Sequence, residues 1–350
     1  MKNPFESSRV TSVAPLPLTN AKFQAVQMLR VHGQLSRTHI AELIGYSPSK
    51  ITGIVNELMD AGIVEEREDS SYTGGRRAKD ISFNPTFGYI VAVVIGINTL
   101  DVALIDFAEK TRVRRLIPIY GKDEPDAVLH TLTKFITERL KKFDISIEKV
   151  YGVGITLSCA IHPISGVPYN SSDLPGWGGF QIDSLLREVF PYAVIVIERD
   201  TNAMAFGELR KGAAKGLMNI VYINIGRSLD ASLIIDGTIY RGANGRTGEI
   251  YRIHTDQNGM SDVLSTESIT NHAGKAIATL VNIVDPQMIL LGGDAGLGHE
   301  FLADVRRSIL GLSQSSATQH LQVDLAPLGI EASLLGIMAL TAEKIFTISD

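Results

Sequence analysis

The sequence has little of several residue types that mark particular classes of protein. Its 350 residues include one cysteine, Cys159, and one tryptophan, and aromatic residues make up only 7% of the chain. A single cysteine excludes an intramolecular disulfide and a cysteine-rich zinc cluster, and such usage is typical of a reducing cytoplasm. No apolar stretch reaches the roughly 18 residues of a membrane helix, and the N-terminus lacks the apolar core of a secretory signal. We therefore expect a cytoplasmic protein without membrane segments.

The chain also lacks a strong charge of either sign. Its formal net charge is −5, so bulk charge does not favour nonspecific binding to nucleic acid. The charge is uneven, because the first 85 residues carry 10 Lys and Arg against 9 Asp and Glu. A hydrophobic content of 45% supports a sizeable core, and the length favours two or more domains.

Three helical patterns follow one another in the first third of the sequence. Apolar residues recur at helical spacing over 20–32, over 37–45 after Ser36, and from Ser47-Pro48 to Gly62. A short turn between the last two helices is the pattern of a helix-turn-helix. Two strands follow, one starting at Ile63 and one over 79–83. We predict a winged helix-turn-helix domain over residues 1–85.

This predicted domain carries side chains suited to both grooves of DNA. Small donors and one cation at the start of the third helix would enter the major groove. Two adjacent arginines on the thin loop between the strands suit the negative potential of a narrow minor groove. The residues predicted to contact DNA are Ser36, Arg37, Ser47, Ser49, Lys50, Thr52, Asn56, Arg76 and Arg77. The alternative is a three-helix interaction domain with a solvated basic loop.

From Gly88 onward, after the break at Asn84-Pro85, apolar strands alternate with amphipathic helices. The predicted elements of the first half are a hairpin over 88–106, a helix over 125–142, strands over 150–157 and 193–197, and a helix over 181–189. Those of the second half are a strand from Asn219, a hairpin, a helix over 266–284 and a strand over 287–291. Two similar halves predict a duplicated α/β architecture with a cleft between two lobes. We place this second domain over residues 86–350.

Several longer motifs resemble those of the ROK family, which comprises repressors, open reading frames and kinases. The motifs are TGGRR (73–77), DLPGW (173–177), RDTNAMAFGE (199–208), IIDGTIYRGANGRTGEI (234–250) and LVNIVDPQMILLGG (280–293). The resemblance covers nearly the whole chain and implies an actin-like ATPase fold of the hexokinase type for the second domain. Family members with a winged helix are usually sugar-responsive repressors, whereas those without it are usually sugar kinases.

Both phosphate loops that the resemblance implies are altered in this sequence. The Asp-x-Gly-Gly-Thr turn of the kinases is replaced by Val94-Ile95-Gly96-Ile97-Asn98, which lacks the carboxylate and the hydroxyl. The second, glycine-rich loop reads Gly226-Arg227-Ser228-Leu229-Asp230, where the carboxylate of Asp230 would repel a triphosphate. We therefore expect no catalytic residues and no cofactor. The alternative is an active ATP-dependent sugar kinase of the ROK family.

The sugar site that the resemblance implies is partly retained. Asp200 matches the catalytic base of the family, and Asn202 and Glu249 are also kept, while Asp173, Arg199 and Arg252 replace an Asn, an Asn and a His. Two fixed cations would favour an anionic ligand, such as a sugar phosphate or a sugar acid. Alternatively, Arg199 pairs with Asp173 or Glu249 and fills an unused pocket. The predicted effector-binding residues are Asp173, Arg199, Asp200, Asn202, Glu249 and Arg252.

The zinc motif of the family is absent, because residues 256–264 read DQNGMSDVL, and no metal is expected. Our leading hypothesis is a regulator, a repressor of carbohydrate-related genes, that binds a double-stranded DNA operator as a homodimer or homotetramer. Its effector would be a sugar, a sugar phosphate or a sugar acid. A third hypothesis is a regulator that has lost its effector and responds to a protein partner or to nothing.

Overall fold

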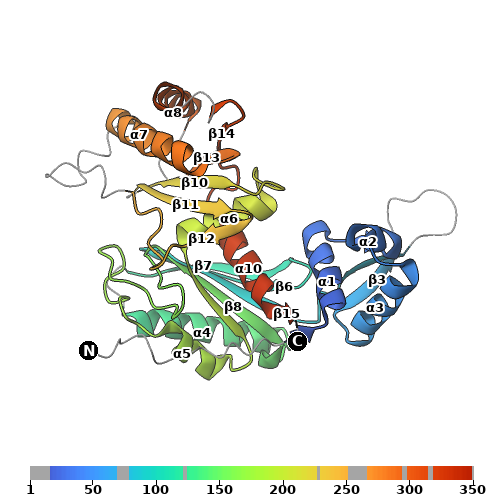
Figure 1. The fold of residues 1–350 in the computed structure, drawn as a ribbon. Coiled ribbons are helices and arrows are strands. Elements are labelled where there is room, and N and C mark those ends of the chain that lie inside the picture. The colour runs from blue at the N-terminus through green and yellow to red at the C-terminus, as the bar shows by residue number, and fades with distance from the viewer. Residues whose placement is uncertain are drawn as a thin grey trace, which may run out of the picture.

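The computed structural model describes residues 16–68, 79–120, 124–226, 229–250, 266–293, 298–313 and 318–348. We call residues 16–84 the N-terminal unit, residues 89–199 the first lobe and residues 220–325 the second lobe. Figure 1 shows the N-terminal unit at one end of the molecule, beside the two larger lobes.

Three helices and a small antiparallel sheet form the N-terminal unit. They are α1 (Asn20–His32), α2 (Arg37–Ile44), α3 (Pro48–Asp60), β2 (Leu35–Ser36), β3 (Val64–Glu68) and β4 (Lys79–Phe83), with strand order β2-β4-β3. The side chains of Ser36 and Ser47 cap α2 and α3 by accepting backbone N–H groups, as these residue types do at helix starts. The three predicted helices and the two predicted strands of this unit are confirmed.

The first lobe is a five-stranded sheet with two helices on one face. Its elements are β5 (Tyr89–Ile95), β6 (Thr99–Asp106), β7 (Thr111–Pro118), α4 (Pro125–Lys142), a short 3-10 helix η1 (Ile147–Lys149), β8 (Val150–Leu157), α5 (Ile182–Val189) and β9 (Val194–Arg199). Among the described residues the strand order is β7-β6-β5-β8-β9. Leu129, Leu132 and Ile136 of α4 are fully buried against the sheet.

The second lobe repeats this arrangement. Its elements are β10 (Ile220–Ile225), β11 (Leu229–Ile235), β12 (Thr238–Tyr240), α7 (Thr266–Val284), β13 (Met288–Gly292), α8 (His299–Leu312) and β14 (Gln322–Leu325). The strand order within the described residues is β12-β11-β10-β13-β14. Each lobe thus has three antiparallel strands followed by two parallel ones. The predicted duplicated α/β architecture is confirmed.

Two helices lie between the sheets of the lobes, as Figure 1 shows. α10 (Glu331–Ile345) packs on β5, β8 and β9, while α6 (Asp200–Lys211) packs on β10 and β11. The two backbones touch, because a Cβ atom at Gly336 would lie 1.7 Å from the carbonyl oxygen of Ala203, and one at Gly207 would lie 2.2 Å from that of Ala332. Only glycine permits this close approach of two helices.

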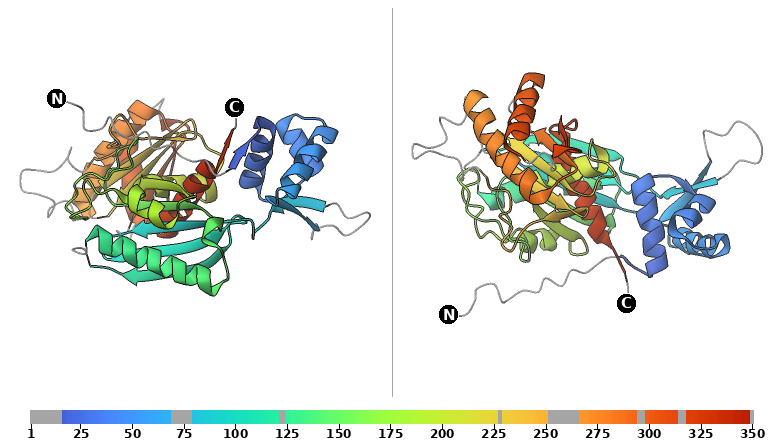
Figure 2. Two further views of the ribbon diagram at one scale, coloured as in Figure 1. Left: turned by 90° about the horizontal axis from the view of Figure 1, so that it is seen from below. Right: turned by 45° about the horizontal axis from the view of Figure 1, so that its top comes forward.

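The N-terminal unit is attached to the first lobe at the far end of α10. β1 (Leu16–Leu18), just before α1, pairs in parallel with β15 (Phe346–Ile348), just after α10. The ring of Phe83 in β4 lies 6.1 Å from those of Phe107 and Phe346. Figure 2 shows α1 beside the end of α10 in both views. The sequence did not predict this pairing of residues from opposite ends of the chain.

Candidate functional site

The first candidate site is the exposed face of α3. One side of this helix is buried through Ile51, Ile54, Val55 and Leu58, so the opposite side faces solvent. The exposed side chains include five of the residues predicted to contact DNA, namely Ser47, Ser49, Lys50, Thr52 and Asn56. The structure therefore brings these five together on the exposed side of one helix and its N-cap.

Short contacts order the side chains at the start of α3. The hydroxyls of Ser47 and Ser49 lie 3.2 Å apart, and Thr52 Oγ1 donates to the carbonyl of Pro48 at 2.9 Å. The ammonium of Lys50 lies 3.5 Å above the centre of the Tyr46 ring. A helix start with exposed hydroxyls and one cation is chemically suited to phosphate and to base edges.

Arg37 is held inside the N-terminal unit. Its guanidinium pairs with Glu66 at 2.6 Å and donates to Asn56 Oδ1 at 3.5 Å, so it joins α2, α3 and β3. In this arrangement Arg37 orients Asn56, whose amide nitrogen remains available as a donor. Ser36 caps α2 and is partly exposed. The two wing arginines, Arg76 and Arg77, lie outside the described residues.

The second candidate site is centred on Asp200, the first residue of α6. Asp200 Oδ2 accepts the hydroxyl of Ser158 at 2.6 Å, and Oδ1 accepts the backbone N–H of Thr201 at 2.7 Å. Burial raises the pKa of this carboxyl, and the negative charge of Asp230 raises it further. Asp200 therefore lies where the end of β8 meets the start of α6, and each of its carboxylate oxygens accepts a hydrogen bond from the protein.

Arg199, immediately before Asp200, is one of the most deeply buried charged residues of the described chain, at 3% exposure. Its Nη2 donates to the backbone carbonyl of Ala231 in the second lobe. Nε and Nη1 are buried and have no hydrogen-bond partner within the described residues. The partner of Arg199 is thus a backbone carbonyl of the opposite lobe, and neither Asp173 nor Glu249 fills that role.

Glu198 is a buried charged residue that the sequence analysis did not select. One carboxylate oxygen accepts from Asn202 Nδ2 at 2.8 Å and the other from Arg241 Nε at 2.8 Å. Asn202, predicted to contact effector, is thereby held on Glu198 and is 5% exposed. A single carboxylate ending the apolar strand β9 was the available sequence signal for such a buried charge.

Glu249 reaches the Asp200 site through the backbone of the second lobe. It forms an isolated antiparallel bridge with Asp230 of β11. Gly248 has a positive φ of 85°, and a Cβ there would lie 1.9 Å from the carbonyl oxygen of Ala231. Glycine is required at position 248 by this close approach and by the positive φ.

Two carboxylates and one guanidinium of the Asp200 site act on the nearby thiol of Cys159. Burial raises the pKa of the Cys159 thiol to about 12, and the carboxylates of Asp200 and Glu249 add to the rise. Asp173 lies on the loop between β8 and α5, where its backbone N–H donates to Ser171 Oγ at 3.2 Å. Arg252 lies outside the described residues. The structure thus groups Arg199, Asp200 and Glu249 electrostatically.

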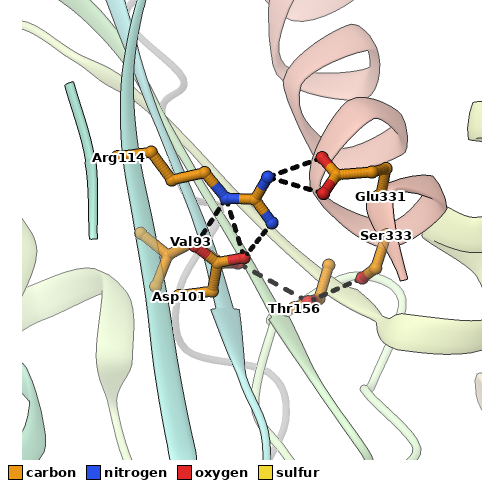
Figure 3. Close-up of polar contacts among 6 residues, drawn as sticks. All are labelled: Val93, Asp101, Arg114, Thr156, Glu331 and Ser333. Atoms are coloured by element: carbon orange, nitrogen blue, oxygen red, sulfur yellow. Dashed lines mark hydrogen bonds and ion pairs between the residues drawn. The ribbon is translucent and has the colours of Figure 1, made fainter. Parts of the chain in front are cut away.

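A network beneath this site fixes α10 on the first lobe, as Figure 3 shows. Arg114 of β7 lies between Asp101 of β6 and Glu331 at the start of α10, with both carboxylates at 2.6 Å. The hydroxyls of Thr156 and Ser333 lie 3.2 Å apart. Thr156 lies near the end of β8, two residues before Ser158, so this network helps to position the residue that donates to Asp200.

The described part of the chain contains no group of three or more His, Cys, Asp and Glu residues arranged to hold a metal ion. The segment that replaces the zinc motif, residues 256–264, lies outside it. Within the same described part, no helix combines the length and apolarity that a membrane span requires.

Comparison with known proteins places this architecture in one family. The model of the ROK family matches residues 90–261 and 252–344. The xylose repressor of Caldicellulosiruptor bescii is 22% identical over 377 aligned residues, which cover 90% of this chain and 94% of that protein.

Two solved structures show the same fold. One is described as a ROK family transcriptional regulator and homologue of the E. coli MLC protein; it is 20% identical with a TM-score of 0.75, covering 93% of this chain and 95% of that one. The other is a ROK family glucokinase from Streptomyces griseus, in complex with glucose and AMPPNP. It is 19% identical with a TM-score of 0.59, and the match covers 73% of this chain and 100% of that one. The predicted actin-like ATPase fold is confirmed. The chain belongs to the ROK family.

Proposed function

We propose that the protein is a sequence-specific transcriptional regulator, a repressor of carbohydrate-related genes, that senses a sugar through its C-terminal domain. The observation that carries this proposal is the α3 face, where five groups suited to DNA recognition stay exposed on a helix anchored by its apolar side. The similarity to the xylose repressor supports it over nearly the whole chain. Residues 1–85 would be the DNA-binding domain and residues 86–350 the sensor.

Specific binding to DNA would use two copies of the chain. One α3 covers only a few base pairs, so a homodimer or homotetramer on a palindromic operator would place two helices about 34 Å or a multiple apart. Ser47, Ser49, Lys50, Thr52 and Asn56 would contact bases and phosphates in the major groove. Arg76 and Arg77 would contact the minor groove. Ser36 and Arg37 would contact the phosphate backbone of the DNA or orient the side chains that do.

The effector that the Asp200 site favours is a neutral sugar. The cationic nitrogens of Arg199 are buried, with one of them on Ala231, so they do not face a ligand from solvent. Among the described residues, the partly exposed charges at this site are the carboxylates of Asp200 and Glu249, which accept hydrogen bonds from sugar hydroxyls and repel a phosphate or a second carboxylate. Asp200 and Glu249 would accept such hydroxyls, and Asp173 and Arg252 would complete the site.

The same charges argue against phosphoryl transfer. The first hairpin turn between β5 and β6 offers Gly96, Ile97 and Asn98, with no carboxylate for a metal-bound phosphate. Asp230 lies on β11 opposite Glu249, and a carboxylate at this place would oppose a triphosphate bound there. We propose that this domain binds sugar without phosphorylating it.

The DNA-binding part of the proposal is tested by selecting genomic fragments that the purified protein retains near physiological salt. Enrichment of a few palindromic sites is expected, and Lys50→Ala should weaken binding to them by about 1–3 kcal/mol and relax the sequence preference. Lys134→Ala, on exposed α4, is the matched control and should bind normally. Uniform retention of fragments by all three proteins would contradict the proposal.

The sensing part is tested by adding D-xylose, D-glucose or glucose 6-phosphate to the selected complex. We expect a neutral sugar to change DNA affinity in the wild type and to leave Asp200→Asn unresponsive. ADP release from ATP in the presence of the same sugars would instead identify a kinase. A response confined to glucose 6-phosphate would overturn the neutral-sugar assignment.

A further inference from the structure

A pocket of about 330 Å³ lies where the N-terminal unit meets the first lobe. One wall comes from the end of α1 and from β4, and the other from the β6–β7 turn, the ends of α6 and α10, and β15. Its volume falls at the lower end of the range of about 300–1,000 Å³ that is usual for small-molecule sites. The pocket is remote from Asp200, because it lies at the opposite ends of α6 and α10.

The floor of this junction pocket is apolar and aromatic. Phe83 comes from the N-terminal unit, while Phe107 and Phe346 come from the other wall, and all three are at least nine-tenths buried. The rings of Phe107 and Phe346 meet edge to face with centres 5.8 Å apart. Met338 of α10 lies on the same surface. Such a floor accepts a flat apolar body and offers it little hydrogen bonding.

The rim of the pocket carries more positive than negative charge. Its basic residues are Arg30, Arg67, Lys211 and Lys215, and its acidic residues are Asp106 and Glu109. Both acids are already neutralised, since Asp106 pairs with Arg112 at 2.7 Å and Glu109 pairs with Lys211.

Two cations of the rim, Lys215 and Arg30, form no ion pair within the described residues. Lys215 is exposed and has no charged partner within the described residues. Arg30 donates to the carbonyl of Ala339 at 3.2 Å and to Gln27. Burial lowers the pKa of Arg30 to about 10, which still leaves it protonated at neutral pH. The carboxylates of Glu343 and Glu109 act on Arg30 from nearby, so an anionic group at the rim would meet mainly the positive charge of Lys215.

We propose that the junction pocket binds a small organic anion with an apolar body, such as an aryl carboxylate, distinct from the sugar at Asp200. The apolar body would lie on the phenylalanine floor, and the anionic group would face Lys215 and Arg30. Because the walls belong to two parts of the molecule, such a ligand fixes the N-terminal unit against the first lobe. Any effect on DNA affinity rests on the proposed function, but binding itself does not.

The binding is tested on the full chain with two fluorescent probes of one shape. Anilinonaphthalene sulfonate is an apolar anion, and N-phenylnaphthylamine has the same body without the charge. Saturable binding of one sulfonate per chain is expected, with the neutral probe weaker by about 2- to 5-fold, as a solvent-exposed ion pair allows. Equal affinity for the two probes would overturn the role of the cationic rim.

Two variants locate the site. Ala108 is an exposed residue on the wall, and Ala108→Trp should fill the pocket and weaken sulfonate binding at least about 10-fold, whereas Ala127→Trp, exposed on α4, should not. Lys215→Ala should weaken the sulfonate and leave the neutral probe unchanged, with Lys134→Ala as control. Unaltered sulfonate binding by Ala108→Trp, in a protein with wild-type circular dichroism, would refute the site.

Discussion

Asp200 illustrates at the scale of one residue how a binding group reduces stability. Its carboxylate is partly desolvated and lies near Asp230, so its pKa is raised above that of an exposed aspartate. A raised pKa means that folding favours the neutral form, and the folded state therefore loses stability as pH rises from the unfolded pKa, about 3.9, through the folded one. Ionisation of Asp200 at neutral pH therefore costs folding free energy.

Asp200→Asn should therefore raise the melting temperature in the absence of sugar. The amide can still accept the N–H of Thr201 and can donate to Ser158, so the local contacts survive. We expect a rise of about 2–4 °C near pH 7 that shrinks toward zero near pH 4, measured by calorimetry across that range. Asp60→Asn, at an exposed position, should show no such pH dependence. A lower melting temperature at pH 7 would refute the assigned cost.

The residues of the site were only partly predictable. Asp200 and Glu249 were selected because their motifs are local in sequence, and the structure places both near Cys159. The partner of Arg199 was not predicted, because Ala231 contributes a backbone carbonyl from the other lobe, and no side-chain pattern in the sequence indicates such a contact. Asn202 was predicted to contact the effector, but its side chain donates to Glu198, four residues earlier in the sequence.

At the scale of elements, the α6–α10 contact is the tightest constraint on the site. The backbones of the two helices are in contact at Gly207 and Gly336, where a Cβ atom on either residue would overlap the other helix. α6 begins at Asp200 and ends at Lys211, while α10 begins at Glu331 and ends beside the N-terminal unit. A displacement of either helix would therefore change the geometry of both the Asp200 site and the junction pocket.

Gly207→Ala should destabilise the protein by about 1–3 kcal/mol, because the added methyl would overlap the carbonyl of Ala332 and force the helices apart. Chemical denaturation measures this loss. Gly53→Ala is the control, since its Cβ would enter open space and alanine favours a helix, so stability should stay level or rise by up to about 1 kcal/mol. Equal effects of the two substitutions would show that the contact is loose.

Elements with a clear apolar period were predicted with their observed bounds. The helix over 125–142 and the strand over 150–157 coincide with α4 and β8. α10 was not predicted, because it is apolar on most sides and so lacks an amphipathic period. β1 and β15 have three residues each, and their pairing depends on tertiary contact alone.

At the scale of the whole molecule, a phenylalanine cluster makes the N-terminal unit part of the cooperative structure. Phe83, Phe107 and Phe346 pack across the junction, and β1 pairs with β15 beside them. We therefore expect the N-terminal unit and the lobes to unfold in one transition.

Phe346→Ala should split that transition in two. Loss of a buried ring costs about 3–5 kcal/mol, and here the cost falls on the junction rather than on either core. Differential scanning calorimetry would show an early transition for the N-terminal unit and a later one for the lobes. Phe180→Ala, next to Trp177 in the first lobe, should lower the melting temperature and keep a single peak. One shifted peak for both variants would contradict the expectation.

The parallel pair of β1 and β15 also has a consequence for synthesis on the ribosome. Residues 16–18 leave the exit tunnel more than three hundred residues before their partner, residues 346–348. At roughly 5–20 residues per second, the first strand waits for tens of seconds without its partner. The N-terminal unit can therefore fold early, but β1 cannot pair with β15 until residues 346–348 have been made, so a chain truncated before residue 346 lacks this link to the lobes.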